Sequence, residues 1–342
     1  MASTDFILPQ GSLVLVTGAN GFIASHIVDQ LLQRGYRVRG TVRNAAKASW
    51  VQELFDKRHD GGKFELSTIS DYTKPEAFID VLKDVTGIIH TVGVTSISPD
   101  PNEVIPPTIA IATALLSAAL SFPSVQRVVF TSSSVAIGFP RPNTVFPVNS
   151  TIFNDAAVEA AWAPPPYTPD RGFPTYAASK VEAEHAIRKF VNEKKPHFKI
   201  NVVLPNTVLG EILDPKNQDG STASLVTGLY TGEKGYWGSL PPSHFINVKD
   251  VACLHVAALL LPGVEGERLL GYAKPFSQTE ILEILRRIEP EKQFESDPEG
   301  EGRDISEVDN ARSEELVRKL TGEGWTGLEE TVKENVKHLQ GR

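Results

Sequence analysis

A short apolar strand that opens directly into a glycine-spaced turn is the feature that most limits how this chain can fold. Residues 11–24 read GSLVLVTGANGFIA, in which residues 13–16 have the composition of a buried strand. Gly18, Gly21 and Ala24 follow at three-residue intervals as a helical pattern begins. Because glycine has no Cβ, the backbone can turn tightly there and approach a phosphate at the first N–H groups of the helix. The turn predicts a phosphate-binding loop, and the alternative is a plain glycine turn without a ligand.

Strand and helix patterns alternate over about the first 135 residues. Short strand patterns occupy residues 13–16, 36–42, 64–69, 85–90, 127–131 and 199–204, and helical patterns include residues 108–121 and 175–194. Such alternation requires parallel strands joined by right-handed crossovers. We therefore expect an α/β protein with a Rossmann-type, doubly wound parallel sheet.

The regular alternation of strand and helix patterns ends near residue 140. Residues 140–174 are rich in proline and are expected to form an irregular flap. We expect a dinucleotide-binding domain over residues 1–207, with a return segment near 244–262, and a smaller lobe over 208–342 that mainly binds substrate. The chain of 342 residues is long enough for this division.

Composition narrows the class of partner. The net charge of -8 argues against nucleic acid and anionic membranes, both of which need a basic surface. The single cysteine, Cys253, and the scattered histidines predict no disulfide framework and no metal site. The uncharged run 104–126 is long enough to span a membrane, but its prolines and hydroxyl groups favour a buried core helix. The N-terminus lacks a secretory pattern, so we expect a cytoplasmic protein that binds small molecules.

The second strand pattern ends among basic residues. In a dinucleotide fold the end of this strand meets the adenosine ribose, where an acidic side chain selects the 2′-hydroxyl and a basic one selects the 2′-phosphate. Arg43 and Lys47 stand there, with no acidic residue between Gln30 and Gln52. This predicts NADP(H) over NAD(H), and the alternative is an ordinary solvated basic face. Arg39 is a weaker candidate for the same role.

A hydroxyl cluster and a Tyr-x3-Lys pair point to acid–base chemistry. Residues 131–134 read TSSS at the end of a strand, and Tyr176 and Lys180 lie one helical turn apart on one face of a later helix pattern. A nearby ammonium makes a phenol a stronger acid, so the pair is a usable proton donor. The spacing also occurs at Tyr230 and Lys234, but those residues lie among glycines and are expected in a loop.

Together these motifs give a family resemblance. The segments TGANGFIA, VRGTVRNAAK, RVVFTSSSVA and YAASK resemble the extended short-chain dehydrogenase/reductases, in particular the dihydroflavonol-reductase-like subgroup. The fungal NADPH-dependent aldehyde and ketone reductases, including methylglyoxal-type reductases, are similar over essentially the whole chain. The resemblance implies an NADPH-dependent carbonyl reductase, which would also run in reverse as an alcohol dehydrogenase.

The resemblance also assigns residues. It implies that Ser133, Tyr176 and Lys180 are catalytic: Tyr176 protonates the carbonyl oxygen, Ser133 hydrogen-bonds it, and Lys180 also holds the nicotinamide ribose. The positions implied to hold NADP(H) are the turn residues Gly18, Ala19, Asn20, Gly21, Phe22 and Ile23, the basic Arg43 and Lys47, Asp71 and Tyr72 at the adenine, and Pro205 and Val208 near the nicotinamide. Many members carry an asparagine where this chain has Ala110, which puts one polar relay group in doubt.

The substrate is the least determined property. Phe139, Tyr167, Phe173, Pro174, Trp237, Leu240 and Phe245 are candidates to line an apolar pocket, which would suit a hydrophobic carbonyl compound. Two other functions remain open on the same scaffold: an epimerase or dehydratase that uses bound NAD(P) transiently, and a non-catalytic NADP-sensing protein.

Overall fold

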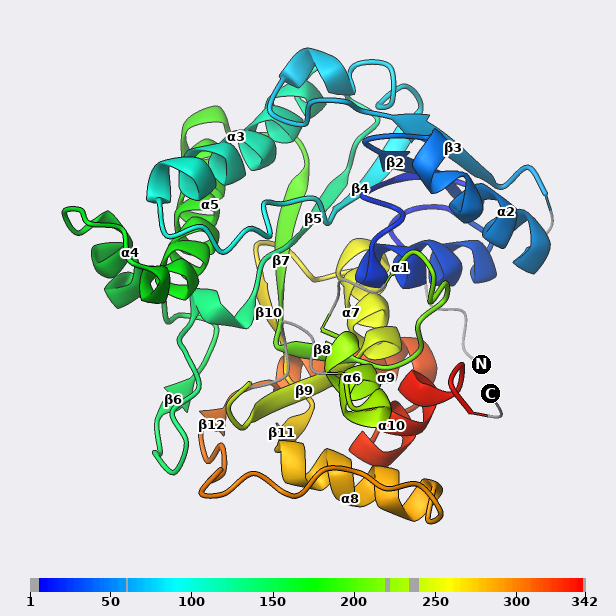
Figure 1. Cartoon of the computed structure of the whole chain (residues 1–342). Coiled ribbons are helices and arrows are strands. Elements are labelled where there is room, and N and C mark those ends of the chain that lie inside the picture. The colour runs from blue at the N-terminus through cyan, green and yellow to red at the C-terminus, as the bar shows by residue number, and fades with distance from the viewer. Residues whose placement is uncertain (1–5, 60, 219–221, 234–239, 341–342) are drawn as a thin grey trace.

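A seven-stranded sheet forms the centre of the molecule in the computed structural model, which describes residues 6–59, 61–218, 222–233 and 240–340 (Figure 1). The strand order is β10-β7-β5-β4-β1-β2-β3, and every neighbouring pair is parallel. This order confirms the predicted doubly wound sheet. The strands are β1 (Leu13–Thr17), β2 (Arg37–Val42), β3 (Phe64–Thr68), β4 (Val85–His90), β5 (Arg127–Thr131), β7 (Lys199–Pro205) and β10 (Arg268–Gly271).

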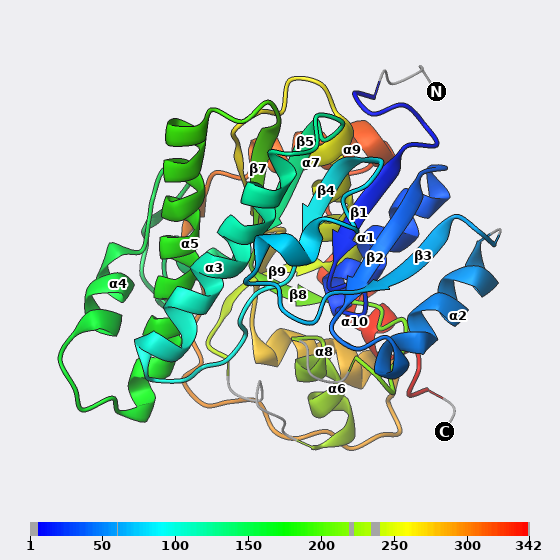
Figure 2. The same ribbon diagram turned by 90° about the horizontal axis from the view of Figure 1, so that it is seen from above.

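Helices cover both faces of the sheet (Figures 1 and 2). One face carries α1 (Phe22–Gln33), α2 (Ser49–Arg58) and α7 (Val248–Leu260), and the other carries α3 (Pro101–Ala119) and α5 (Gly172–Lys194). Side chains of each strand alternate between the two faces, as the period of two requires. In β1, Val14 and Val16 join the first core, whereas Leu13 and Leu15 join the second.

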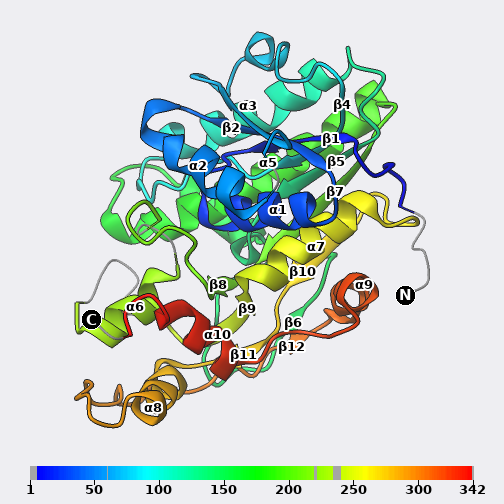
Figure 3. The same cartoon turned by 90° about the vertical axis from the view of Figure 1, so that its right-hand side faces the viewer.

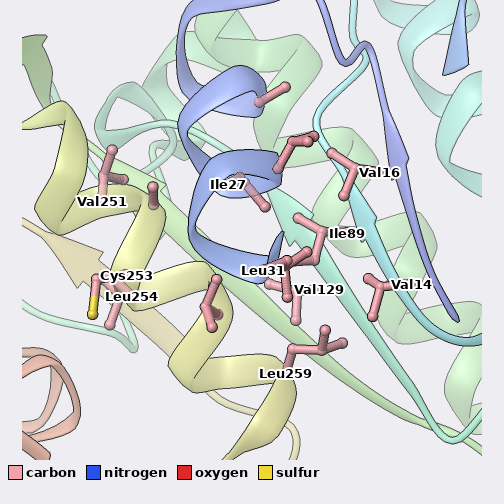
Figure 4. Close-up of a cluster of buried hydrophobic side chains, with 14 of the residues drawn as sticks. Val14, Val16, Ile27, Leu31, Ile89, Val129, Val251, Cys253, Leu254 and Leu259 are labelled. Carbon is pink, nitrogen blue, oxygen red and sulfur yellow. The ribbon is translucent and has the colours of Figure 1, made fainter. Parts of the chain in front are cut away.

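The core on the α1 and α7 face is close-packed. Figure 4 shows Ile27 and Leu31 of α1 against Val16 and Ile89 of the sheet, with α7 alongside. These side chains are fully buried, and each contributes about 1.5–3 kcal/mol relative to an exposed position. Cys253 lies on α7 in the same core, and burial raises the pKa of its thiol to about 12. The thiol is therefore a packing group at neutral pH.

Helix α3 begins earlier than the sequence pattern indicated. The expected start was Thr108, but the helix begins at Pro101, after Asp100 accepts a hydrogen bond from the Asn102 N–H at 2.9 Å. Pro106 and Pro107 lie inside it, although proline cannot donate to the preceding turn. The cap and a buried apolar face outweigh those lost bonds. By length and composition, α3 passes as a possible membrane span, yet half of it is buried here and it packs against α5.

The proline-rich flap is more ordered than expected. It contains α4 (Asp155–Trp162), which Asn154 caps, and the short strand β6 (Pro147–Val148). Strand β6 pairs with β12 (Glu307–Val308), which lies far along the chain. The flap is therefore irregular over most of its length, as predicted, but its apolar residues pack against α5 and the C-terminal segment.

The second half of the chain returns to the sheet and then forms a small lobe below it (Figure 3). The return segment expected near 244–262 continues to β10, which pairs with β7 and completes the sheet. The lobe has its own core. Its elements are β8 (Thr207–Leu209), β9 (Ser243–Asn247), β11 (Lys274–Phe276), α6 (Ser224–Thr231), α8 (Gln278–Ile288) and α10 (Leu328–Val336), while α9 (Ala311–Thr321) packs against α7.

Candidate active site

The glycine turn between β1 and α1 has the shape of a phosphate cradle. Gly18 has a φ of 68°, and a Cβ there would lie 3.0 Å from Val92 Cγ2 and 3.1 Å from Thr91 Oγ1. Gly21 begins α1 without a side-chain cap, so the first N–H groups of the helix are left for a ligand. The positive φ and the close contacts at Gly18 therefore require a glycine there, and a Cβ at Gly21 would lie 3.1 Å from the Gly18 carbonyl oxygen.

The remaining residues of the turn differ in how far their side chains are buried. Ala19 is fully buried, and a Cβ on Gly40 of β2 would approach its Cβ to 2.7 Å. Asn20 is exposed, Phe22 is buried and Ile23 is half-buried at the start of α1. Gly40 therefore acts as the partner that lets β2 pass close to the turn.

A residue that the sequence did not suggest ties the lobe to this turn. Gln218 donates its Nε2 to the Ser25 hydroxyl at 2.9 Å and to the carbonyls of Asn20 and Gly21 at 3.4 and 3.3 Å. No local pattern identifies such a glutamine, because its role depends on a contact across almost two hundred residues.

The basic residues in and after β2 differ in whether their side chains already have a partner. Arg43 and Lys47 are exposed, and neither forms an ion pair with any described residue. Arg39 instead pairs with Glu65 and donates to the carbonyls of Val81 and Lys83. Arg39 is thus held at the outer strands, whereas the other two remain free to meet an anion.

The two residues expected at an adenine also differ in burial and in their hydrogen-bond partners. Asp71 is half-buried, and the Thr73 hydroxyl and N–H that it accepts, together with Lys74, lower the pKa of its carboxyl. Tyr72 is only 4% exposed and donates its hydroxyl to Thr41 at 2.9 Å. The Tyr72 ring is therefore part of the core beside β2, and its place at the adenine stays a prediction.

Pro205 and Val208 belong to the consecutive strands β7 and β8, and their place near a nicotinamide stays a prediction. Pro205 ends β7, which pairs with β5 as far as Thr131. Val208 is 4% exposed and packs into the main core from β8.

Tyr176 and Lys180 come together in the first turns of α5. The Lys180 ammonium lies 5.4 Å from the centroid of the Tyr176 ring, and Lys180 is 8% exposed. A Cβ on Gly93, just after β4, would lie 3.0 Å from the Lys180 Nζ. The missing side chain at Gly93 makes room for the ammonium at the same strand end that carries the glycine turn.

The three serines after β5 have separate roles. Ser133 accepts a hydrogen bond from the Val135 N–H at 3.5 Å and is half-buried, so its hydroxyl can still meet a ligand. Ser134 bonds the buried Tyr272. Ser132 donates to Glu184 of α5 at 2.5 Å. Only Ser133 keeps the availability that the resemblance assigned to it.

A buried ion pair fixes this serine segment against α5. Glu184 accepts from Ser132 at one oxygen and from Arg268 Nε at the other, at 2.7 Å, and both charged residues are under 10% exposed. Arg268 also donates to the carbonyls of Ser150 and Ile152. Glu184 was missed, although its position one helical turn after Lys180 places it on the same face.

The tyrosine of the other Tyr-x3-Lys pair lies outside this site. Tyr230 belongs to α6, not to a loop as expected, and its hydroxyl donates to Glu289 at 3.4 Å. Lys234 lies outside the described residues. Ala110 is in α3 and carries no polar group, but Thr108 of the same helix lines a cavity beside Lys180.

The expected apolar pocket is only partly supported. Phe245 is fully buried in the core of the lobe, and Leu240 packs against that core, so both are structural. Phe173 is 42% exposed beside Pro174 at the start of α5, and Phe139 and Tyr167 are half-buried. Trp237 lies outside the described residues. In the part of the chain that the structure describes, no group of side chains could hold a metal ion.

The arrangement joins an anion cradle, a tyrosine beside an ammonium, and a serine hydroxyl at one edge of the sheet. It has the groups to hold a dinucleotide and to move a proton at a neighbouring carbonyl oxygen. The glycine positions and the unpaired Arg43 and Lys47 fit a phosphorylated dinucleotide.

Comparison with known proteins gives matches over most of the chain. The profile of the NAD dependent epimerase/dehydratase family matches residues 14–268. Aldehyde reductase 2 of Sporidiobolus salmonicolor is 40% identical over 339 residues, covering 98% of each chain. Ketoreductase adrE of Penicillium rubens is 40% identical over 336 residues, covering 95% of this chain and 96% of its own. The structure of yeast methylglyoxal/isovaleraldehyde reductase Gre2 complexed with NADPH has a TM-score of 0.77 and 26% identity, covering 96% of this chain and 98% of its own.

Proposed function

The chain belongs to the NAD dependent epimerase/dehydratase family and is an oxidoreductase, and on that premise we propose that it is an NADPH-dependent carbonyl reductase. It reduces a ketone or an aldehyde to an alcohol, and the reaction is reversible. The observation that carries this proposal is the pairing of Tyr176 with Lys180 at the strand edge where the glycine turn lies.

The cofactor has a natural place along this edge. The backbone of the turn at Gly18 and the start of α1 would hold the pyrophosphate, and Arg43 and Lys47 would hold the 2′-phosphate. Lys180 would contact the ribose next to the reactive ring. When bound, NADPH supplies the hydride for the carbonyl carbon. The similar structure of yeast Gre2, which was crystallised in complex with NADPH, supports this assignment.

The protein residues handle the carbonyl oxygen. Tyr176 donates its phenolic proton as negative charge develops on that oxygen, and Ser133 donates a hydrogen bond to the same atom. The Lys180 ammonium stabilises the phenolate that remains. Each of these roles depends on preorganisation by α5 and by the buried Glu184 that holds the serine segment.

The substrate is expected to be a small, hydrophobic carbonyl compound. Phe173 supplies exposed aromatic surface in the first turn of α5, and Tyr167 lies beside Arg171 just before that helix. A panel of aromatic and polar ketones tests this, and equal turnover of both classes would contradict it.

Net oxidation of NADPH with a carbonyl panel, followed by its near-ultraviolet absorbance, tests the function. Stoichiometric loss of NADPH with a ketone is expected. Product from a sugar nucleotide without net cofactor change would indicate an epimerase, and NADPH binding without any turnover would indicate a sensor.

Tyr176→Phe tests the proton donor directly. Loss of general acid catalysis lowers kcat by about 100-fold or more, while the dissociation constant of NADPH, measured by fluorescence, stays within a few-fold. Tyr230→Phe is the matched control, because that tyrosine has the same spacing to a lysine and bonds only Glu289. A Tyr176→Phe protein with the parental kcat would overturn the mechanism.

A further inference from the structure

A small cavity lies beside Lys180, between the sheet and helices α3 and α5. Its volume is about 30 Å³, and a water molecule needs roughly 10–15 Å³ of such space. The cavity is lined by apolar groups and by a few polar ones. The polar lining residues that matter are His90, Thr108, Ser132, Lys180 and Glu184.

His90 presents a polar atom without a partner. His90 is 2% exposed, and its Nε2 is buried without a hydrogen bond to any described residue. Its Nδ1 lies 2.9 Å from Thr17 Oγ1. That hydroxyl already accepts from the N–H groups of Thr91 at 3.1 Å and Val92 at 3.4 Å, so its own proton goes to Nδ1. The imidazole proton is therefore on Nε2, which is a buried donor that needs an acceptor.

The imidazole is neutral in this position. Burial, and then the charge of Lys180, lower the pKa of His90 to about 3. The charged groups that face the cavity are Lys180 and Glu184 from α5, and Arg268 reaches it only through Glu184. A neutral donor and a cationic donor thus face one space. Two direct donors cannot bond each other, but both can donate to one water oxygen.

The cavity also offers acceptors for the protons of such a water. Thr108 Oγ1 donates to the Val104 carbonyl at 2.7 Å, which leaves its lone pairs free. Ser132 donates to Glu184, which leaves acceptor capacity on the hydroxyl and on the carboxylate. A water with two donors and two acceptors around it has the three or four bonds typical of buried waters.

We propose that this cavity holds a structural water that accepts hydrogen bonds from His90 Nε2 and from the Lys180 ammonium, and that His90 thereby positions Lys180 under Tyr176. His90 does not touch substrate or cofactor, so it is a positioning residue. The part of the inference that concerns catalysis rests on the proposed carbonyl reduction, whereas the water site does not.

A high-resolution crystal structure of the full-length protein tests the site itself. Ordered density within hydrogen-bond distance of both His90 Nε2 and Lys180 Nζ is expected. A cavity without that density overturns the inference even if carbonyl reduction is confirmed. If the density is present and no carbonyl is turned over, the water site stands and the proposed function fails.

Two substitutions at His90 test its positioning role. His90→Gln keeps an N–H donor close to the position of Nε2, and it is expected to keep the water and most of kcat. His90→Leu removes the donor, and it is expected to lose the water density and to lower kcat on the order of 10-fold, with a smaller change in the KM of the carbonyl substrate. A parental kcat in His90→Leu, or a His90→Gln protein as impaired as His90→Leu, would overturn the role.

His255→Leu is the matched control for loss of a buried imidazole. His255 is fully buried on α7, across the sheet, and both of its ring nitrogens have partners, Thr131 and the Val251 carbonyl. This variant is expected to lower the melting temperature while the cavity water and the kcat are kept. Loss of the water in His255→Leu, whose partner Thr131 also lines the cavity, would show that removing a neighbouring buried imidazole is enough to empty the cavity, and would overturn the specific role of His90.

Discussion

Arg43 and Lys47 stand out among the charged residues near the strand ends because neither has an acidic partner in the described part of the chain. An unpaired arginine loses no existing ion pair when it binds a phosphate. Arg39, two strand positions before Thr41, is by contrast committed to Glu65. At the scale of single residues, selection of the cofactor therefore depends on which cations the fold leaves free.

The Arg43→Ala and Lys47→Ala double variant tests this selection. Loss of charge-assisted bonds to a 2′-phosphate is expected to raise the KM of NADPH by about 10-fold to 100-fold and to leave the KM of NADH nearly unchanged. Arg37→Ala is the control, because Arg37 is exposed at the opposite end of β2. An unchanged preference for NADPH over NADH in the double variant would contradict the assignment.

Residue types and spacing were enough to predict that the glycine turn joins β1 to α1, that Tyr176 and Lys180 lie one turn apart on one helix, and that Arg43 follows β2. Each is set by local geometry or by a strand end. Spacing was not enough to predict that the Tyr72 ring is buried, because the side on which a loop residue packs depends on distant neighbours. The same reason hid Gln218 and His90, whose partners lie on other strands and loops.

At the scale of elements, α5 organises the site because it carries three functional side chains at four-residue intervals. Tyr176, Lys180 and Glu184 follow one face of the helix, and Glu184 ties that face to β10 through Arg268. The start of α3 and the existence of β10 were harder to predict. A helix that contains prolines and a strand of only four residues both have weak sequence patterns. Tertiary packing determines whether such elements form.

Glu184→Gln is expected to be strongly destabilising. The substitution leaves the buried Arg268 without its counter-charge, which costs about 3–5 kcal/mol, and the melting temperature is expected to fall by several degrees. Glu193→Gln on the same helix is the control, since its pair with Lys189 is exposed and is worth at most about 1 kcal/mol. Equal melting temperatures for the two variants would show that the buried pair does not hold the segment.

At the scale of the whole molecule, the C-terminal segment that contains Thr326 and Glu334 is hydrogen-bonded and ion-paired to the start of α7. Asp250 accepts hydrogen bonds from the N–H and the hydroxyl of Thr326 at 2.6 and 3.0 Å. Lys249 bridges Glu211 and Glu334 from the same turn. The lobe and the sheet therefore share one set of polar contacts, so we expect them to unfold together.

Asp250 predicts how this junction responds to pH. Burial raises the pKa of its carboxyl from 3.8 to about 6, so the folded protein binds that proton more tightly than the unfolded chain does. The contribution of Asp250 to the free energy of unfolding is therefore greatest below about pH 4, and it is lost as the pH rises through about 6. The upper limit of the change is about 3 kcal/mol. The melting temperature of the wild-type protein relative to Asp250→Asn should fall over this range, and a constant or rising difference would contradict the prediction.

The seventh strand has a consequence for synthesis and truncation. Because β10 comes from residues 268–271 and pairs with β7, a chain that ends before it exposes the N–H and carbonyl groups along one margin of β7. A nascent polypeptide on the ribosome passes through a state in which residues 13–205 have been synthesised but β7 is still an unpaired edge strand. Truncated proteins that end near residue 262 are consequently expected to self-associate through the unpaired edge of β7. We therefore expect that truncation there does not give a soluble dinucleotide-binding domain.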